Sequence, residues 1–229
     1  HNAACPENPD FSMGYVWPVY DTYDVFASNL DGSELRQLTT EDGYDAEATF
    51  SPVGDRIVFT SARDGDLELY SMAPDGSDLV RLTDRPGYDG GAFYSPDGSK
   101  IIWRAYYPEE GAELEDYRRL LSQGLLRPGE LEIYVMDADG SNQQQLTQLG
   151  GANFAPYWHP SGEKILFSSN HHDPDGRDFE IYMINIDGSG LTRITYMEGF
   201  DGFPVFSPDG RYLVFGSNRN NGGTNDTNV

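Results

Sequence analysis

Four polar residues recur at one fixed position of an internal repeat, and their types are those that bind cations. Asp45, Asp89, Asn153 and Asp201 each stand six residues before a Ser or His that precedes a proline. If the repeats close around a channel, these side chains form an arc at one mouth of it. Three carboxylates and one amide repel one another unless a cation or hydrogen-bond donors offset them. Hard oxygen ligands of flexible geometry favour Ca²⁺.

The same position has a second interpretation. An Asp or Asn beside a turn also satisfies backbone N–H groups within its own repeat. Such a structural role recurs just as regularly as a ligand site. The sequence leaves both interpretations open.

A second acidic segment, residues 173–180, resembles the start of a calcium-binding loop. Asp173, Asp175 and Asp178 surround Gly176, but the distant Glu that completes an EF-hand is absent. An ordinary hairpin loop is the alternative. The candidate metal ligands are therefore Asp45, Asp89, Asp201, Asp173, Asp175 and Asp178.

Two residues depart from the repeat and are added as candidate ligand contacts. His159 stands where the other three copies have Ser, although Ser would satisfy the structure alone. Arg104 replaces Thr60, Ser168 and Gly216. We expect Arg104 either to contact an anionic ligand or to pair with one of the many acids.

The repeat that positions these residues has two markers. Asp-Gly-Ser followed by Leu/Ile-Thr spans residues 31–39, 75–83, 139–147 and 187–195. An aromatic residue followed by Ser/His-Pro-x-Gly begins at residues 50, 94, 158 and 206. Both markers step by 44, 64 and 48 residues, so they belong to one repeating unit.

Each unit is predicted to hold four short strands. A segment precedes the Ser-Pro marker, apolar runs such as Ile57–Phe59 and Leu67–Tyr70 follow it, and a last strand ends in Leu-Thr. Four-stranded units of this length are typical of β-propeller blades, whereas a β-sandwich does not repeat in this way. The predicted fold class is all-β: a β-propeller of four-stranded blades with one inserted helix.

The blade boundaries follow from the markers within one propeller domain, 1–229. Residues 45–88, 89–152 and 153–200 are blades, and 201–229 is an incomplete one. Residues 23–44 resemble the outer half of an incomplete blade, and 1–22 an insert or blade remnant. We therefore expect about four to five blades of a larger ring. The chain starts without Met, as a processed chain, a fragment or the ordered part of one does.

The longest interval contains an insert at residues 106–128. Its segment 112–121 has helical spacing, with acids first and arginines later, as suits the helix dipole. The apolar face comprises Leu114, Tyr117, Leu121 and Leu125. The helix either covers the channel, docks a partner or packs on its own blade.

The pattern FSPDG…IVFTS…DLELYSMAPDGS…RLT resembles the repeats of the TolB-like propeller family over residues 23–218. The resemblance implies six blades, with about two missing upstream, and a periplasmic or extracellular location. TolB carries an additional N-terminal α/β domain that meets envelope proteins, and nothing in this chain matches it. The chain therefore resembles a TolB-like protein rather than TolB itself.

The composition restricts the partners. The 229 residues include 38 acidic and 15 basic ones, a net charge of −23, which repels nucleic acid and anionic membranes. No apolar run is long enough to span a bilayer. The composition does not exclude binding of cations, basic partners or neutral ligands. Cys5, the only cysteine, has either a disulfide partner elsewhere or an inert free thiol.

Catalytic motifs are absent: the chain has no Gly-x-Ser-x-Gly, His-Glu-x-x-His or Cys-x-x-Cys. The leading hypothesis is a non-catalytic, monomeric scaffold that binds an envelope or extracellular protein or a small ligand, with Ca²⁺ as its favoured cofactor. One alternative is a lyase or hydrolase acting on an envelope saccharide or peptide. That alternative requires His159, Arg104, Asp89 and Asp201 to converge in one pocket. Another is the propeller domain of a larger hydrolase.

Overall fold

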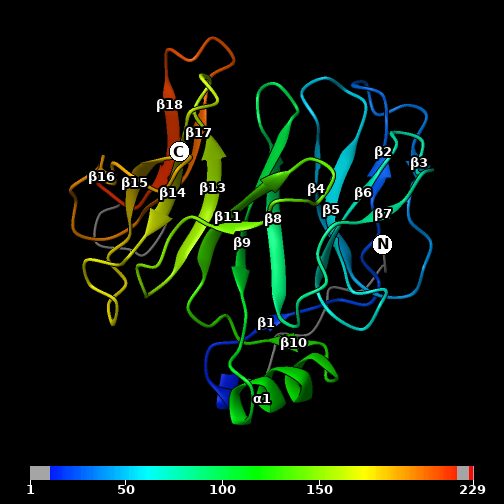
Figure 1. Ribbon diagram of the computed structural model, residues 1–229, viewed down its shortest axis with the longest axis horizontal. Coiled ribbons are helices and arrows are strands. Elements are labelled where there is room, and N and C mark those ends of the chain that lie inside the picture. Colours follow the sequence, from blue (N-terminus) through cyan, green and yellow to red (C-terminus); the bar gives the residue numbers. More distant parts are fainter. Residues whose placement is uncertain (1–10, 221–226, 229) are drawn as a thin grey trace. The chain divides into compact units, whose positions relative to one another are not determined.

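Strands dominate the computed structural model, which describes residues 11–220 and 227–228; Cys5 lies outside the described residues. One 3₁₀ helix, η1 (Phe11–Met13), and one α-helix, α1 (Ala112–Leu121), accompany the strands (Figure 1). The strands are β1 (Trp17–Pro18), β2 (Phe26–Ala27), β3 (Arg36–Gln37), β4 (Asp45–Phe50), β5 (Ile57–Ser61), β6 (Glu68–Met72), β7 (Val80–Arg81), β8 (Tyr88–Tyr94), β9 (Lys100–Tyr106), β10 (Leu125–Leu126), β11 (Glu132–Asp137), β12 (Gln144–Gln145), β13 (Asn153–Trp158), β14 (Lys164–Ser169), β15 (Glu180–Asn185), β16 (Thr192–Arg193), β17 (Asp201–Phe206) and β18 (Leu213–Ser217).

Three antiparallel sheets have four strands in sequence order, which confirms the predicted repeating unit. They are β4-β5-β6-β7, β8-β9-β11-β12 and β13-β14-β15-β16. Three further sheets have two strands each, β1-β10, β2-β3 and β17-β18. We call each four-stranded sheet a blade and its first strand the inner strand.

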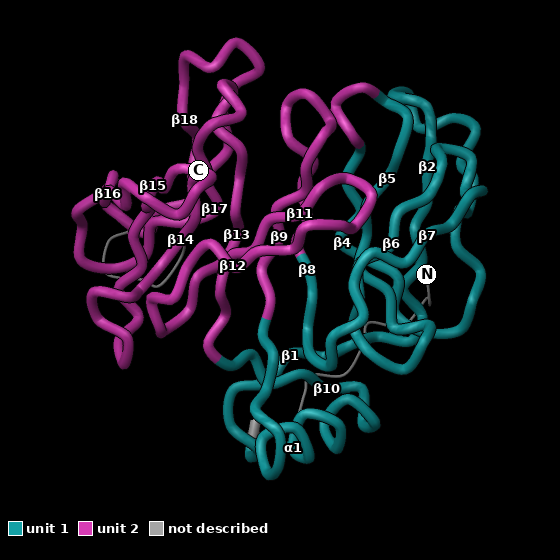
Figure 2. Tube along the Cα trace, in the orientation of Figure 1, with its two compact units in different colours: residues 1–50, 54–90, 106–129 teal, residues 51–53, 91–105, 130–229 magenta. Residues whose placement is uncertain are grey.

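The chain divides into two compact units (Figure 2). The first comprises residues 1–50, 54–90 and 106–129, and the second 51–53, 91–105 and 130–229. Apolar side chains of successive sheets form the core of each unit. The core of the first unit holds Val25, Ile57, Phe59, Tyr70 and Met72. That of the second holds Ile102, Ile133, Val135, Trp158, Ile165, Phe167, Tyr182 and Ile184.

The Asp-Gly-Ser marker forms the hairpin turn between the third and fourth strands. In the first blade, Asp75 Oδ1 accepts hydrogen bonds from Ser77 N at 3.0 Å and Ser77 Oγ at 2.6 Å. Gly76 between them has φ +88°, a left-handed conformation that Gly adopts without strain. These hydrogen bonds also lower the pKa of Asp75. The other three copies repeat the contact.

The threonine that ends the marker holds the fourth strand to the third. Thr83 is buried, and its Oγ1 accepts a hydrogen bond from Leu69 N at 2.8 Å. Equivalent bonds join Thr39 to Val25, Thr147 to Ile133 and Thr195 to Ile181. A side chain therefore satisfies a backbone donor that the two-residue outer strands leave without a backbone partner.

The inserted helix packs within the first unit. Helix α1 contributes the buried side chains Tyr117 and Leu120, and it lies beside the paired strands β1 and β10 (Figure 1). The predicted helix bounds are confirmed, but its apolar face differs from the expectation. Leu120 is buried instead of Leu121, and Leu125 belongs to β10 because the helix ends before it. Within the described residues, no helix is long and apolar enough to cross a membrane.

Replacing Thr83 with Val tests the threonine bond, since the two side chains have similar shape. We expect the free energy of unfolding to fall by about 1–3 kcal/mol, because Leu69 N becomes a buried donor without an acceptor. Chemical denaturation measures the change. The control Thr40→Val alters an exposed residue of the same unit and should stay within about 0.5 kcal/mol. An equal effect of the two substitutions would contradict the assignment.

Candidate functional site

The four recurring polar residues lie at the junctions between successive sheets. Asp45, Asn153 and Asp201 begin β4, β13 and β17, and Asp89 is the second residue of β8. Each of the four is at most 2% exposed. Each backbone N–H donates to a carbonyl of the preceding sheet region. The bonds are Asp45 N to Tyr23 O (2.9 Å), Asp89 N to Leu67 O (2.9 Å), Asn153 N to Leu131 O (3.0 Å) and Asp201 N to Phe179 O (2.8 Å).

The side chains of the aspartates accept hydrogen bonds from residues 18 positions further on. Arg63 Nη2 donates to both carboxylate oxygens of Asp45 at 3.1 Å. Arg219 Nη2 donates to one carboxylate oxygen of Asp201, Oδ2, whereas Oδ1 accepts no hydrogen bond from the described residues. Tyr107 supplies a neutral donor instead, with its hydroxyl 2.5 Å from Asp89 Oδ1. For Asp45 and Asp201 a guanidinium therefore offsets the buried charge.

The third blade changes both members of the pair. Asn153 replaces the aspartate, and the residue 18 positions on is His171. Asn153 Nδ2 donates to Leu131 O at 3.0 Å and Glu132 Oε2 at 3.1 Å, while Ser169 Oγ donates to Asn153 Oδ1 at 2.6 Å. Burial lowers the pKa of His171, which favours the neutral ring. In the third blade, the carboxylate and the arginine of the first blade are therefore both replaced, by Asn153 and His171.

Hydrogen-bond donors thus supply the compensation that these acidic positions require. The side-chain partners named above lie in the same sheet region as the polar residue or in the one before it. Among residues 11–220 and 227–228, no three His, Cys, Asp or Glu side chains gather closely enough to hold a metal ion.

His159 forms a turn that Ser95 and Asp97 form in the second blade and Ser207 and Asp209 form after β17. Its Nδ1 accepts a hydrogen bond from Ser161 N at 3.1 Å and lies 2.9 Å from Ser161 Oγ. In the second blade, Ser95 Oγ donates to Asp97 Oδ1 at 2.6 Å at the equivalent place. In the third blade, His159 and Ser161 thus replace the Ser–Asp contact of the second blade.

The structure does not bring His159 and Asp201 together. The His159 ring contacts Phe206, at 5.0 Å between centroids, at the end of β17. Asp201 begins the same strand, and a strand of this length spans roughly 16 Å. Within the second unit, this separation opposes a catalytic pocket shared by the two residues.

Arg104 fills a space that a glycine leaves open. Gly91 on the neighbouring strand has φ +61°, and a Cβ there would lie 2.2 Å from Arg104 Nη1. The residues equivalent to Gly91 also have positive φ angles: Glu47 (57°), Ala155 (50°) and Phe203 (56°). The blades with these side chains carry the smaller Thr60, Ser168 and Gly216 in place of Arg104. Size complementarity across a bulge therefore accounts for the exchange to arginine.

The acidic segment 173–178 forms a hairpin loop in the structure. Gly176 N donates to Asp173 O at 2.9 Å, which closes a turn. Asp178 Oδ1 accepts a bond from Gly199 N at 2.9 Å, and its Oδ2 lies 3.2 Å from His172 Nε2. Asp66 has the same place in the first blade and accepts a bond from Gly87 N at 3.1 Å. Asp173 and Asp175 are exposed.

A second position of the repeat also carries buried acids, and the sequence patterns did not predict it. Glu68 pairs with Arg81 at 2.8 Å, and Glu180 with Arg193 at 2.7 Å, both 13 residues apart. In the second blade, the residue 13 positions after Glu132 is Gln145, and Glu132 Oε1 accepts bonds from the N–H groups of residues 149 and 150. Burial raises the pKa of Glu132. In the aligned repeats, the partner of each buried acid stands 13 or 18 residues after it. This regular spacing is the sequence signal for both sets of partners.

Known proteins share this architecture. A family model described as the TolB beta propeller domain matches residues 15–111. TolB from Acinetobacter baumannii has a TM-score of 0.68 at 18% identity, covering 89% of this chain and 45% of its own. A protein assigned as TolB from Agrobacterium tumefaciens has a TM-score of 0.63 at 23% identity, covering 89% and 71%. A puromycin-hydrolysing peptidase from Mycobacterium tuberculosis has a TM-score of 0.59 at 16% identity, covering 88% and 33%.

These similarities confirm the predicted fold, a TolB-like β-propeller. The chain spans less than half the length of the Acinetobacter protein and a third of the peptidase. No curated protein sequence matches it.

Replacing Arg63 with Met should lower the free energy of unfolding by about 3 kcal/mol, because Asp45 then stays buried without its cation. Adding Asp45→Asn should make the double variant at least about 1 kcal/mol more stable than the sum of the single effects predicts. Chemical denaturation of the four proteins gives this coupling.

The pair Arg56 and Asp78 is the matched control, with an ion pair of 2.6 Å and an Asp78 side chain that is 73% exposed. Its coupling should stay below about 1 kcal/mol. Additive effects of Arg63→Met and Asp45→Asn would show that the buried pair is not the unit we describe.

Proposed function

We propose that the protein is a non-catalytic, secreted or periplasmic propeller that acts as a scaffold for binding a protein or a ligand. One observation carries this proposal: candidate acidic and basic side chains of the protein form hydrogen bonds and ion pairs that hold the blades together. Asp45 and Asp201 are held by arginines, and His159 completes a turn. The side chains that an enzyme would need free are thereby committed to the blades.

The location and the class of partner rest on resemblance and charge. The TolB-like fold supports an envelope or extracellular setting, as the sequence pattern implied. The net charge of −23 favours a partner with a basic surface, because complementary charge accelerates encounter. We expect the propeller to act as a monomer.

A second candidate is the propeller part of a larger hydrolase. The similarity to the mycobacterial peptidase favours it, since this chain covers only 33% of that protein. In this case the acids and bases of catalysis would belong to a separate catalytic domain, and the propeller would carry none of them.

Binding can be tested by capture from an envelope extract of the source organism, followed by reconstitution with the purified captured protein. We expect a one-to-one complex with micromolar or tighter affinity that weakens as salt screens the acidic surface. The proposal would be wrong if no captured protein binds in purified form and the purified chain cleaves peptide or glycoside substrates. The protein would then be an enzyme.

Stabilisation by Ca²⁺ is a further part of the proposal. It rests on the loop that carries Asp173, Asp175 and Asp178, of which Asp173 and Asp175 are exposed, and on Asp89 as a second candidate ligand. A ligand that binds only the folded state raises its stability by about 2.7 kcal/mol at a hundredfold excess over its Kd.

We therefore expect millimolar Ca²⁺ to raise the Tm relative to EDTA, and Asp89→Asn or Asp175→Asn to abolish the rise. The Ca²⁺-dependent increment is compared, so a general loss of stability does not confuse the result. Glu198→Gln removes an equal charge from an exposed residue outside the candidate set and should keep the rise. An unchanged Tm and no bound metal by elemental analysis would return these aspartates to purely structural roles.

A further inference from the structure

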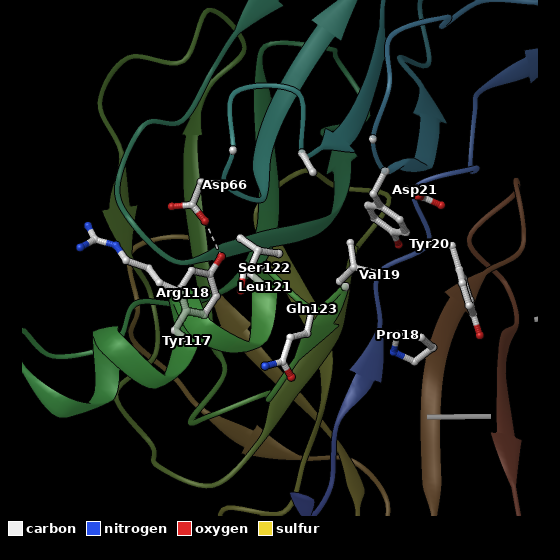
Figure 3. Close-up of a pocket in the computed structure, with 15 residues that line it drawn as sticks. Pro18, Val19, Tyr20, Asp21, Asp66, Tyr117, Arg118, Leu121, Ser122 and Gln123 are labelled. Carbon is white, nitrogen blue, oxygen red and sulfur yellow. Dashed lines mark hydrogen bonds between the residues drawn. The ribbon is translucent and has the colours of Figure 1, made fainter. Parts of the chain in front are cut away.

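The first unit contains a pocket of about 870 Å³ beside the inserted helix (Figure 3). Three parts of the chain line it: the segment after β1, the loops at the ends of β4 to β6, and the end of α1. The lining residues are Pro18, Val19, Tyr20, Asp21, Gly43, Tyr44, Ala62, Gly65, Asp66, Tyr117, Arg118, Leu121, Ser122, Gln123 and Gly124. Its volume lies in the range of pockets that hold small ligands.

The walls of this pocket are fixed by hydrogen bonds. Val19 N donates to Gly124 O at 2.7 Å, which joins the segment after β1 to the end of the helix. The buried Tyr117 hydroxyl donates to Asp66 and to Gly87 O, which joins the helix to the first blade (Figure 3). A wall held in this way loses little entropy when a ligand binds.

Two carboxylates and one guanidinium line the pocket, from Asp21, Asp66 and Arg118. Asp21 is exposed and has no hydrogen-bond or ion-pair partner among the described residues. Asp66 accepts bonds only from neutral donors, namely the Tyr117 hydroxyl and the N–H groups of Leu67 and Gly87. The Arg118 guanidinium extends away from Val19 and Gln123 (Figure 3). Neither carboxylate is therefore neutralised by a cation of the protein.

The helix contributes a further negative end. Helix α1 ends at Leu121, and residues 121–124 line the pocket. The carboxyl end of a helix carries a partial charge of about −0.5 and favours cations within its last turn.

Aromatic and aliphatic surfaces complete the lining. Tyr20 and Tyr44 line the pocket, and each ring contacts Tyr23, at 4.9 Å and 5.9 Å between ring centroids. The faces of tyrosine rings attract ammonium and guanidinium groups. Val19 and Leu121 add apolar surface for an aliphatic chain.

We propose that this pocket binds an organic cation with an aliphatic stem. The chemistry is that of a lysine or arginine side chain of another protein, or of a free alkylamine. Two carboxylates, a helix carboxyl end and tyrosine rings all select positive charge, and the net charge of −23 acts against anions. The inference does not depend on the scaffold function, since a free amine would occupy the same pocket.

Titration of the ¹⁵N-labelled chain by NMR tests the proposal. The probes are the Nα-acetyl, methylamide derivatives of lysine and arginine, and n-butylamine. We expect saturable shifts of the backbone amides of Asp21, Gly43, Gly65 and Gly124. Tighter binding of the amino-acid derivatives points to a protein side chain as the source, and tighter binding of butylamine to a free amine.

Charge and position are controlled separately. The Nε-acetyl form of the lysine probe has nearly the same shape without the charge, and it should bind at least threefold more weakly. Asp21→Asn should weaken the binding of the charged probes about three- to fivefold, as expected for one exposed ion pair. Asp55→Asn removes the same charge from an exposed residue of the same unit that does not line the pocket, and it should leave the affinity unchanged.

Three outcomes would overturn the proposal: no saturable shift with any cation, equal binding of the neutral probe, or equal effects of Asp21→Asn and Asp55→Asn. Because the probes are defined small molecules, these outcomes are independent of whether a protein partner is captured.

Discussion

A buried polar side chain at the junction of consecutive sheets is the constraint on which this fold depends. The same residue donates its backbone N–H to the preceding sheet and carries a carboxylate or amide that water cannot reach. Leaving such a carboxylate uncompensated costs several kcal/mol. Arg63 and Arg219 meet this demand, and the third blade avoids it with Asn153. Junction and compensation are therefore coupled in every blade.

This coupling changes the meaning of residues that resemble an active site. An acid beside a cation is the arrangement expected of catalysis, but here it recurs because each junction needs it. His159 and Arg104 depart from the repeat for similar reasons. His159 rebuilds a turn with Ser161, and Arg104 occupies the volume above Gly91. A departure from a repeat consensus indicates function only after such compensating exchanges have been considered.

The parts of the chain that do not repeat are the better place to look for specificity. A repeated scaffold provides the frame, and irregular segments on it carry binding. Strand β1, helix α1 and strand β10 have no counterpart in the other blades, and they pack together in the first unit. The pocket arises where these segments meet loops of the first blade. Of its two carboxylates, Asp21 lies outside the repeat and Asp66 belongs to the first blade.

The sequence by itself determined the features that depend on neighbours in the chain. The turns of the Asp-Gly-Ser marker, the four-strand order and the helix at 112–121 all follow from local hydrogen bonds and periodicity. Only the tertiary structure decided the burial of Leu120 and the existence of the pocket, whereas the offset of 18 residues in the repeats already signals the pair of Asp45 and Arg63. Val19 meets Gly124 across most of the first unit's chain. Contacts between distant segments depend on how sheets and insert pack, and no local pattern encodes that packing.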